Sequence, residues 1–217
     1  MNIGILGTGI VGQTLGSAFV ANGHKVMLGS RDVNNPNAIK WAASNNSQQG
    51  TFSEAASFGD IILNCTMGIF SLEAIKLAGV ANFKNKVLID VANPVDFSNG
   101  MPPRLTISND NSLGEEIQKL LPDAKVVKAL NTINYEVMVK PGMLNNGNID
   151  LFICGVDEDA KAIVTNLLTT EFKWKRESII DLGELKHARS TESMLLFLIS
   201  LTMKYGTFKN GFKIHRG

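Results

Sequence analysis

A glycine pattern near the start of the chain has the spacing of a phosphate-binding turn. Gly7, Gly9 and Gly12 form the sequence GxGxxG, which follows the apolar run Asn2–Leu6 and leads into an expected helix at Gln13–Asn22. In such a turn the first glycine permits the tight bend, the second lets the backbone approach a pyrophosphate, and the third lets the helix pack against the strand. The helix then presents free N–H groups to the phosphates. The pattern predicts a dinucleotide-binding turn, and the alternative is a glycine-rich turn in an α/β protein that binds nothing.

The end of the second expected strand, His24–Leu28, indicates which dinucleotide would bind. NAD enzymes place a carboxylate there, about 20 residues after the glycines, to accept a hydrogen bond from the ribose 2′-hydroxyl. This chain has Ser30 and Arg31 instead, and a hydroxyl and a guanidinium suit a 2′-phosphate. Asp32 follows directly, and its carboxylate would favour NAD over NADP. The sequence therefore predicts NADP rather than NAD, with a turn-forming Ser30 and a solvated Arg31 as the alternative.

Strand and helix signals alternate along the rest of the chain. The further expected strands are Asp60–Cys65, Lys86–Val91, Lys125–Leu130, Asp150–Cys154 and Ser178–Asp181. The further expected helices are Ser53–Ser57, Ile69–Leu77, Leu113–Leu121, Glu158–Leu168 and Leu185–Tyr205. This alternation indicates βαβ crossovers, and so an α/β fold of the Rossmann type with a doubly wound, mostly parallel sheet and a small C-terminal helical portion. Two looser stretches are Ser44–Gly50 and Asp96–Asn111, of which the second could be a functional loop or a plain surface excursion.

The composition argues against several classes of partner. The formal net charge is +1 over 217 residues, so neither a nucleic acid nor an anionic membrane is an expected partner. Met194–Met203 is apolar but too short to span a membrane, and we expect a buried or interfacial helix there. The first expected strand follows Met1 and Asn2 directly without a basic leader, so we expect a cytoplasmic protein. Cys65 and Cys154 lie in apolar runs, where buried, unreactive thiols are favoured over a disulfide.

Side chains able to transfer protons are sparse where a Rossmann site would need them. Tyr135 and Lys140 are five residues apart rather than the four of a short-chain dehydrogenase pair. His187 is the one histidine at a suitable position, and a charged helix start is favoured over a catalytic base there. Lys128 lies within an expected strand, where salt bridging is favoured over catalysis. Since no spacing of Cys, His and Asp suggests a metal site, we predict neither a catalytic nor a metal-binding side chain.

The last expected helix carries a charged pair and an apolar stripe. Arg189 and Glu192 are three residues apart and could pair on one face. We favour the alternative that they connect this helix to the Rossmann body. The stripe would pack against the core or across a dimer interface, and it consists of Met194, Leu195, Phe197, Leu198 and Leu201.

Several segments spread over nearly the whole chain recur in a known family. They are Gly7–Gly12, Gly29–Asp32, Val127–Ile133, Ile153–Gly155, Asp181–Leu185, Ala188–Ser190 and Glu192–Ser193. The first segment is common to all Rossmann proteins, and the later ones are more specific in this order and spacing. With them the chain resembles the NADPH-dependent reductases of the deazaflavin coenzyme F420. It also resembles the cytosolic reductase domain of the STEAP metalloreductases.

The resemblance implies an NAD(P)-binding Rossmann domain over residues 1–180 and a C-terminal helical segment over residues 181–217 that packs on it, often in a homodimer. NADP(H) would lie across the strand ends, with a flavin or deazaflavin as the second redox partner against its nicotinamide. The implied cofactor-binding residues run from the pyrophosphate turn through the 2′-phosphate and the ribose to the nicotinamide. They are Gly7, Thr8, Gly9, Ile10, Val11, Gly12, Ser30, Arg31, Thr66, Met67, Asn93, Pro94, Ala129 and Asn131.

Two positions depart from the deazaflavin reductases. Those proteins have histidine where this chain has Asn131, whereas the STEAP-like domains have asparagine there. They also carry a basic residue shortly after the arginine, where this chain has Asn34–Pro36 and its nearest cation is Lys40.

The sequence supports three hypotheses of function. The first is an NADPH-dependent oxidoreductase that passes hydride to a flavin-like or deazaflavin acceptor, a transfer that needs positioning more than side-chain chemistry. The second is a reductase of small imines or ketones, similar to the 6-phosphogluconate-dehydrogenase group, although those proteins carry a longer C-terminal helical domain. The third is an NADP-binding redox sensor without turnover.

Overall fold

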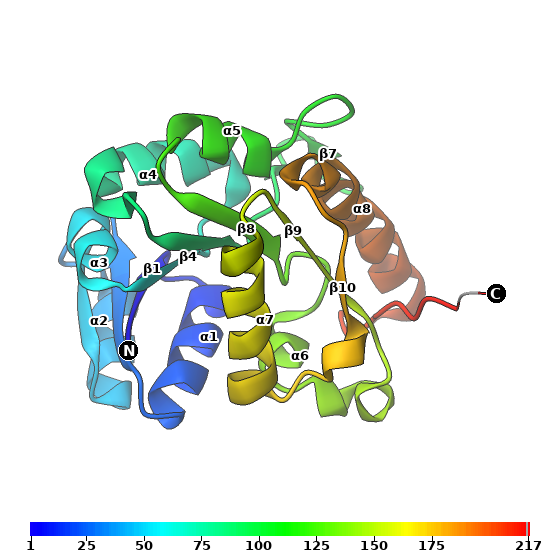
Figure 1. Cartoon of the computed structure of the whole chain (residues 1–217), viewed down its shortest axis with the longest axis horizontal. Coiled ribbons are helices and arrows are strands. Elements are labelled where there is room, and N and C mark those ends of the chain that lie inside the picture. Colours follow the sequence, from blue (N-terminus) through cyan, green and yellow to red (C-terminus); the bar gives the residue numbers. More distant parts are fainter. Residues whose placement is uncertain (216) are drawn as a thin grey trace.

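The computed structural model describes residues 1–215 and 217, and an eight-stranded sheet lies between its helical layers (Figure 1). The strands of this sheet are β1 (Asn2–Leu6), β2 (Lys25–Ser30), β3 (Gln48–Thr51), β4 (Ile61–Asn64), β5 (Val87–Asp90), β8 (Lys125–Ala129), β9 (Leu151–Gly155) and β10 (Ile179–Asp181). Their order is β10-β9-β8-β5-β4-β1-β2-β3, and neighbours are parallel except for the antiparallel pair of β8 and β9. The predicted doubly wound, mostly parallel Rossmann sheet is confirmed.

Helices cover both faces of the sheet. One face is covered by α1 (Ile10–Ala21), α2 (Pro36–Asn45), α6 (Tyr135–Val139) and α7 (Glu158–Phe172). The other face is covered by α3 (Phe52–Phe58), α4 (Ser71–Ala78) and α5 (Leu113–Leu120). The last helix, α8 (Ala188–Tyr205), packs against α5. Short 3-10 turns complete the described part, at Gly68–Phe70, Val80–Phe83, Pro141–Met143, Asn145–Gly147, Arg176–Ser178 and Leu185–His187.

Strand β4 shows why an inner strand begins with an unbroken apolar run, here Ile61–Leu63 before Asn64. Ile61 and Leu63 join the core cluster under α1, whereas Ile62 joins the cluster under α4. Successive side chains of a strand point to opposite faces, and here both faces are buried. An unbroken apolar run is therefore the expected pattern of an inner strand.

The segment between β2 and α3 was the largest error of the sequence-based prediction. Ser44–Gly50 was expected to be loose, but it contains the end of α2 and the start of β3. Helix α2 begins where the Asn35 side chain accepts hydrogen bonds from the backbone of Asn37 and Ala38, with Pro36 in the first turn. Strand β3 is a polar edge strand that pairs only with β2, so its sequence lacks the apolar run of an inner strand.

The stretch Asp96–Asn111 is partly ordered by a small hairpin. Strands β6 (Val95–Asp96) and β7 (Arg104–Leu105) pair antiparallel beside the main sheet. The Asp96 carboxylate accepts hydrogen bonds from the Ser98 backbone and hydroxyl and from the Arg104 guanidinium. The long connection is therefore held by its own contacts.

The chain after α8 returns to the sheet. The Asp150 backbone N–H donates to the Phe212 carbonyl at 2.7 Å. The Asp150 carboxylate, which is almost fully buried, accepts from Lys213 Nζ and from the Ile214 backbone N–H, both at 2.7 Å. The described residues after Tyr205, called the tail below, are thus anchored beside β9. Within the described residues, every helix is too short or too polar to cross a membrane.

Candidate functional site

The glycine-rich turn between β1 and α1 forms an open cradle. Gly7 has a φ of 120°, and a Cβ there would lie 2.6 Å from the Cys65 carbonyl oxygen. A Cβ on Gly12 would lie 2.5 Å from the Gly7 carbonyl oxygen, whereas a Cβ on Gly9 would meet nothing within 4 Å. Gly9 is the N-cap of α1 and has no side chain that could cap the helix, so the N–H groups of the first turn are left for a ligand. This geometry fits a pyrophosphate. Helix α1 begins at Ile10, three residues before the predicted start, so its first N–H groups lie directly at the glycine turn.

The cradle lies at the carboxyl edge of the sheet, at its topological switch point. Strand β1 is flanked by β2 and β4, and Leu6 is paired with Gly29 on one side and Asn64 on the other. Strands β5 and β8 end at the same edge. Ligands of open α/β sheets bind in the crevice at such a point. The structure therefore brings most of the predicted cofactor-binding residues to one edge.

The predicted 2′-phosphate residues lie at the end of β2, and both already have partners. Ser30 is buried, and its hydroxyl donates to the Asp32 carbonyl. The Arg31 guanidinium is exposed and lies 3.4 Å from the carboxylate of Glu73, in the first turn of α4. A 2′-phosphate would compete with Glu73 for the guanidinium. This contact could not be predicted from spacing, because Glu73 lies 42 positions from Arg31 in the chain.

The loop after β4 carries Thr66 and Met67. The Thr66 hydroxyl lies 2.7 Å from both Asn64 Oδ1 and the Ser71 hydroxyl, whereas the Met67 side chain is exposed. Gly68, which the sequence analysis did not single out, packs so closely that a Cβ would lie 2.0 Å from the Asn93 carbonyl oxygen. The loops after β4 and β5 therefore touch through this glycine.

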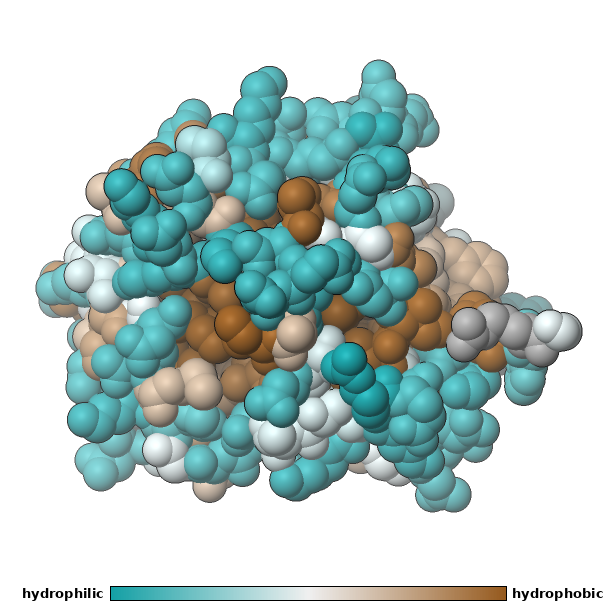
Figure 2. All heavy atoms as spheres, viewed as in Figure 1, coloured by the Kyte–Doolittle hydropathy of each residue, from teal (hydrophilic) through white to brown (hydrophobic). Residues whose placement is uncertain are grey.

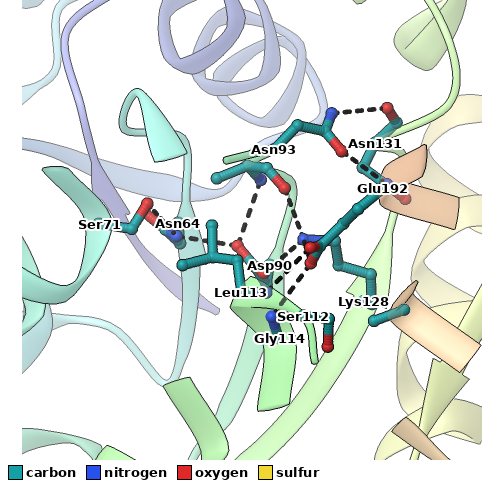
Figure 3. Close-up of polar contacts among 12 residues, drawn as sticks. Asn64, Ser71, Asp90, Asn93, Ser112, Leu113, Gly114, Lys128, Asn131 and Glu192 are labelled. Atoms are coloured by element: carbon teal, nitrogen blue, oxygen red, sulfur yellow. Dashed lines mark hydrogen bonds and ion pairs between the residues drawn. The ribbon is translucent and has the colours of Figure 1, made fainter. Parts of the chain in front are cut away.

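Asn93 and Asn131 join the ends of β5 and β8. The Asn93 side-chain amide donates to the Asn131 carbonyl, and the Asn131 side-chain amide donates to Asn93 Oδ1, both at 2.9 Å (Figure 3). Between Ala129 and Asn131, Leu130 has a φ of 65°, which is unusual for a branched residue and turns the chain toward Asn93. Asn131 Oδ1 is buried and has no hydrogen-bond partner among the described residues. A polar donor from a bound molecule or a water is the expected partner of such an atom.

A cleft of about 350 Å³ opens between these loops and the C-terminal portion. One wall contains the predicted residues Val11, Thr66, Met67 and Asn93. The other wall comes from α8 and the tail, and is mainly apolar: Leu195, Leu198, Ile199, Thr202, Phe208 and Asn210. The described lining residues include no Asp, Glu, Lys, Arg, His or Tyr. The apolar stripe of the last helix was predicted to pack against the core or across a dimer interface. Two of its residues, Leu195 and Leu198, line this wall of the cleft.

The remaining predicted site residues lie around this cleft without lining it. Ser30 and Arg31 are at the neighbouring strand end, and Ala129 and Asn131 are buried behind Asn93. Pro94 is held by the hairpin, because the Thr106 backbone N–H donates to its carbonyl at 2.8 Å. The surface shown in Figure 2 is mostly hydrophilic, with apolar atoms in a central band and beside the C-terminal segment.

Lys128 is not in the cleft but in a buried cluster of charges beneath it. Its ammonium lies 2.7 Å from the carboxylates of Asp90 and Glu192 (Figure 3). Burial lowers the pKa of Lys128, but the two carboxylates outweigh it and raise that pKa above its usual value. Burial raises the pKa of Glu192, against the opposing effect of Lys128. The predicted salt bridging of Lys128 is confirmed.

Arg189 and Glu192 do not pair with each other as their spacing had allowed. Arg189 Nε donates to Glu115 of α5 at 2.8 Å, whereas Glu192 turns inward to Lys128. The two side chains therefore meet different neighbours. Both connect α8 to the Rossmann body, which is the alternative that we favoured. His187 is half-buried just before α8 and does not line the cleft.

The cysteines differ in exposure. Cys154 is buried as predicted, and burial raises the pKa of its thiol to about 12. Cys65 is only partly buried and lines the cleft, which corrects the prediction of two buried thiols. Burial and the nearby Asp90 raise the pKa of the Cys65 thiol, so both thiols are protonated at neutral pH. The described residues contain no group of acidic, His and Cys side chains suited to a metal ion.

Comparison with known proteins identifies the family. Residues 2–94 match the family described as NADP oxidoreductase coenzyme F420-dependent. The F420-dependent NADP reductase of Methanocaldococcus jannaschii is 30% identical over 225 aligned positions, which cover 99% of this chain and 98% of that protein. The chain belongs to the F420-dependent NADP oxidoreductase family.

Two further proteins are similar to this chain. A crystal structure of a candidate F420-dependent NADP reductase from Arthrobacter sp. FB24 is 40% identical, and it superposes over 100% of both chains with a TM-score of 0.93. The metalloreductase STEAP3 of Rattus norvegicus is 28% identical over 199 residues, covering 91% of this chain and 37% of that protein. The resemblance inferred from the sequence motifs is confirmed, and the chain is an NADP-dependent oxidoreductase.

Proposed function

We propose that this family member transfers hydride between NADP(H) and a flat acceptor of the flavin or deazaflavin type, bound together in the cleft. The observation that carries the proposal is the composition of the two walls. One wall is formed by the loops at the carboxyl edge of the sheet, and the other by apolar side chains of α8 and the tail. Bound NADP(H) supplies the hydride at its nicotinamide ring.

The segments that follow successive strands of the sheet would each hold one part of the cofactor. Gly7 to Gly12 cradle the pyrophosphate, and Ser30 and Arg31 bind the 2′-phosphate. Thr66 and Met67 border the ribose. Asn93, Pro94, Ala129 and Asn131 border the nicotinamide, which is supported by the unpartnered oxygen of Asn131.

The apolar wall would exclude water and hold the acceptor ring against the nicotinamide. Hydride transfer between stacked rings depends mainly on holding the reacting atoms about 3–3.5 Å apart. The lack of titratable side chains in the described lining, apart from the protonated thiol of Cys65, fits this chemistry. An imine or ketone reductase would need a proton donor beside the substrate, so that alternative is less well supported.

The arrangement of the chain adds three parts to the proposal. Residues 1–180 form the NADP(H)-binding Rossmann domain, and residues 181–217 form a C-terminal helical segment that completes the acceptor side.

The protein acts as a homodimer in the cytoplasm. Exposed apolar side chains near the cleft, including Met67, Phe97 and Phe208, support a second copy as the partner. Light scattering coupled to size-exclusion chromatography should give twice the mass of the chain, and a monomer at micromolar concentration would contradict this part.

Titration of NADPH and NADH into the wild-type protein and the variant Arg31→Ala tests the cofactor assignment. We expect NADPH to bind at least about tenfold more tightly than NADH, and we expect the variant to lose that difference. A screen with flavins and with coenzyme F420 would then identify the acceptor. Tight NADPH binding without turnover on any acceptor would favour the redox sensor, and equal binding of NADH would overturn the NADP assignment.

A further inference from the structure

The buried charges beneath the cleft come from three different elements. Asp90 ends β5, Lys128 lies in β8, and Glu192 belongs to the first turns of α8. Their side chains are at most 1% exposed, so no solvent screens them. None of the three lines the cleft. The cluster therefore acts on the cleft only through the groups that it holds.

Glu192 is held by more donors than a single salt bridge supplies. Its Oε2 accepts from the Leu113 backbone N–H at 2.9 Å, and its Oε1 accepts from the Gly114 backbone N–H at 3.1 Å and from Lys128 at 2.7 Å. Since these N–H groups belong to the start of α5, the carboxylate also lies at the positive end of that helix. These donors favour the ionised form and fix the orientation of its side chain.

The same cluster fixes the backbone that leads to Asn93. Lys128 Nζ donates to the Ala92 carbonyl, and Asp90 Oδ1 accepts from the Ala92 backbone N–H at 3.2 Å. Ala92 is thus held at both of its polar backbone groups, and Asn93 follows directly. Asn93 in turn makes the amide pair with Asn131 at the proposed nicotinamide position. An unbroken chain of contacts therefore runs from Glu192 to the cofactor wall of the cleft (Figure 3).

Glu192 also anchors the helix that carries the other wall. It precedes Leu195, Leu198 and Ile199 on α8, and these residues face the cleft from the acceptor side. We propose that Glu192 is a positioning residue for hydride transfer, which through Lys128 and Ala92 sets the Asn93 wall relative to the α8 wall. This inference rests on the proposed NADP(H) site. Because the transfer depends on short distances between stacked rings, a single anchor shared by both walls controls its geometry.

The isosteric variant Glu192→Gln tests the proposal. Glutamine keeps the volume of the side chain but offers one acceptor oxygen and an NH2 group to the three donors, so at least one donor loses its partner. We expect Ala92 and Asn93 to shift and the nicotinamide half of the cofactor to bind less well. The probe 2′,5′-ADP contains the adenosine half and its 2′-phosphate but no nicotinamide, so its binding should not change.

Calorimetric titration of both ligands gives the comparison. For Glu192→Gln we expect the Kd of NADPH to rise by about tenfold or more and the Kd of 2′,5′-ADP to stay within about twofold. The control variant Arg189→Gln removes a second polar connection between α8 and α5, the partly exposed pair of Arg189 with Glu115, which includes none of the three cluster residues. For this control both constants should stay within about twofold.

Several results would overturn the proposal. One is an equal loss of both ligands in a folded Glu192→Gln variant, another is no change in either, and a third is the same selective loss in Arg189→Gln. If Glu192→Gln fails to unfold cooperatively, Glu192→Asp, which keeps the charge, takes its place with the same expected selective loss. If the wild-type protein binds neither ligand, the proposed function itself fails. If it binds both and the variant matches it, only the role of Glu192 fails.

Discussion

Single residues of the cradle show that glycines of one motif have separate tasks. Gly12 is confined by the Gly7 carbonyl, whereas Gly9 faces open space. We expect Gly12→Ala to lower the free energy of unfolding by about 2–3 kcal/mol, because its methyl group would overlap backbone. Gly9→Ala should change it by less than about 1 kcal/mol but should weaken NADPH binding, because the methyl group enters the phosphate space.

Urea unfolding together with NADPH titration of the two glycine variants measures both quantities. Equal stability losses in the two variants would contradict the assigned roles. An unchanged NADPH affinity in Gly9→Ala would show that the phosphates do not approach this residue.

The contact between Arg31 and Glu73 gives a second prediction for single residues. Because Glu73 competes with a 2′-phosphate for the guanidinium, Glu73→Gln should tighten NADPH binding by about twofold to fivefold at low salt. NADH binding should change less. The control Glu177→Gln makes the same charge change at an exposed position and should have no effect. Titrations at two salt concentrations check this, and weaker NADPH binding in Glu73→Gln would instead make Glu73 part of the binding site.

At the scale of elements, helices α5 and α8 are joined by the pair of Glu115 and Arg189. The hydrogen bond from Arg189 lowers the pKa of Glu115 below 4.5, against the opposing effect of burial. A lowered folded-state pKa gives stability that is present above the unfolded value and is lost as pH falls through the folded value. The pair is partly exposed, so its contribution is below about 1 kcal/mol.

We therefore expect Glu115→Gln to destabilise the protein slightly at pH 7, and we expect this difference to be smaller at about pH 3, because the stabilisation is lost as the pH falls below 4.5 toward the lowered folded-state pKa of Glu115. Urea midpoints of the wild type and the variant at both pH values provide the measurement. A difference of the same size at both pH values would show that the loss comes from packing and not from the charge.

How far the elements could be predicted depended on their place in the sheet. Inner strands such as β4 and β5 begin with apolar runs before Asn64 and Asp90, and both were predicted within one residue at each end. Strand β3 and helix α2 were missed, because an edge strand and a helix that buries only Ala38, Trp41 and Ala42 carry weak apolar patterns. Local capping signals, such as Asn35 with Pro36, were the available evidence.

The candidate site was predictable where contacts are local in the chain. The GxGxxG turn was predicted from its spacing after a strand, whereas the cofactor-binding residues after β4, β5 and β8 were implied by the family resemblance; parallel strands place all of these positions at one edge of the sheet. The ion pair of Arg31 with Glu73 and the cluster around Lys128 join residues far apart in sequence. Spacing alone cannot show such pairs, since they depend on how the helices are placed on the sheet.

At the scale of the whole molecule, the contacts that hold the C-terminal portion include those of α8 near Glu192, the ion pair of Lys209 with Glu136, and the bonds of the tail to Asp150. Asp150→Asn should weaken the bonds to Lys213 and Ile214 and release the tail. We expect faster proteolysis after residue 205 and weaker binding of the acceptor, with NADPH affinity within about twofold of the wild type. Mass spectrometry of timed digests checks this. Asp159→Asn, an exposed control, should match the wild type, and an unchanged cleavage rate in Asp150→Asn would show that other contacts hold the tail.

The placement of the acceptor wall in α8 and the tail has a consequence for the order of synthesis. The glycine cradle and the ends of β4, β5 and β8 leave the ribosome before α8 is translated. Domains generally fold as units, N-terminal first, during synthesis, and the proposed Rossmann domain emerges ahead of α8. A nascent chain can thus assemble its dinucleotide cradle while the cleft still lacks its second wall, so the nucleotide is available to the folding chain before any acceptor can be held.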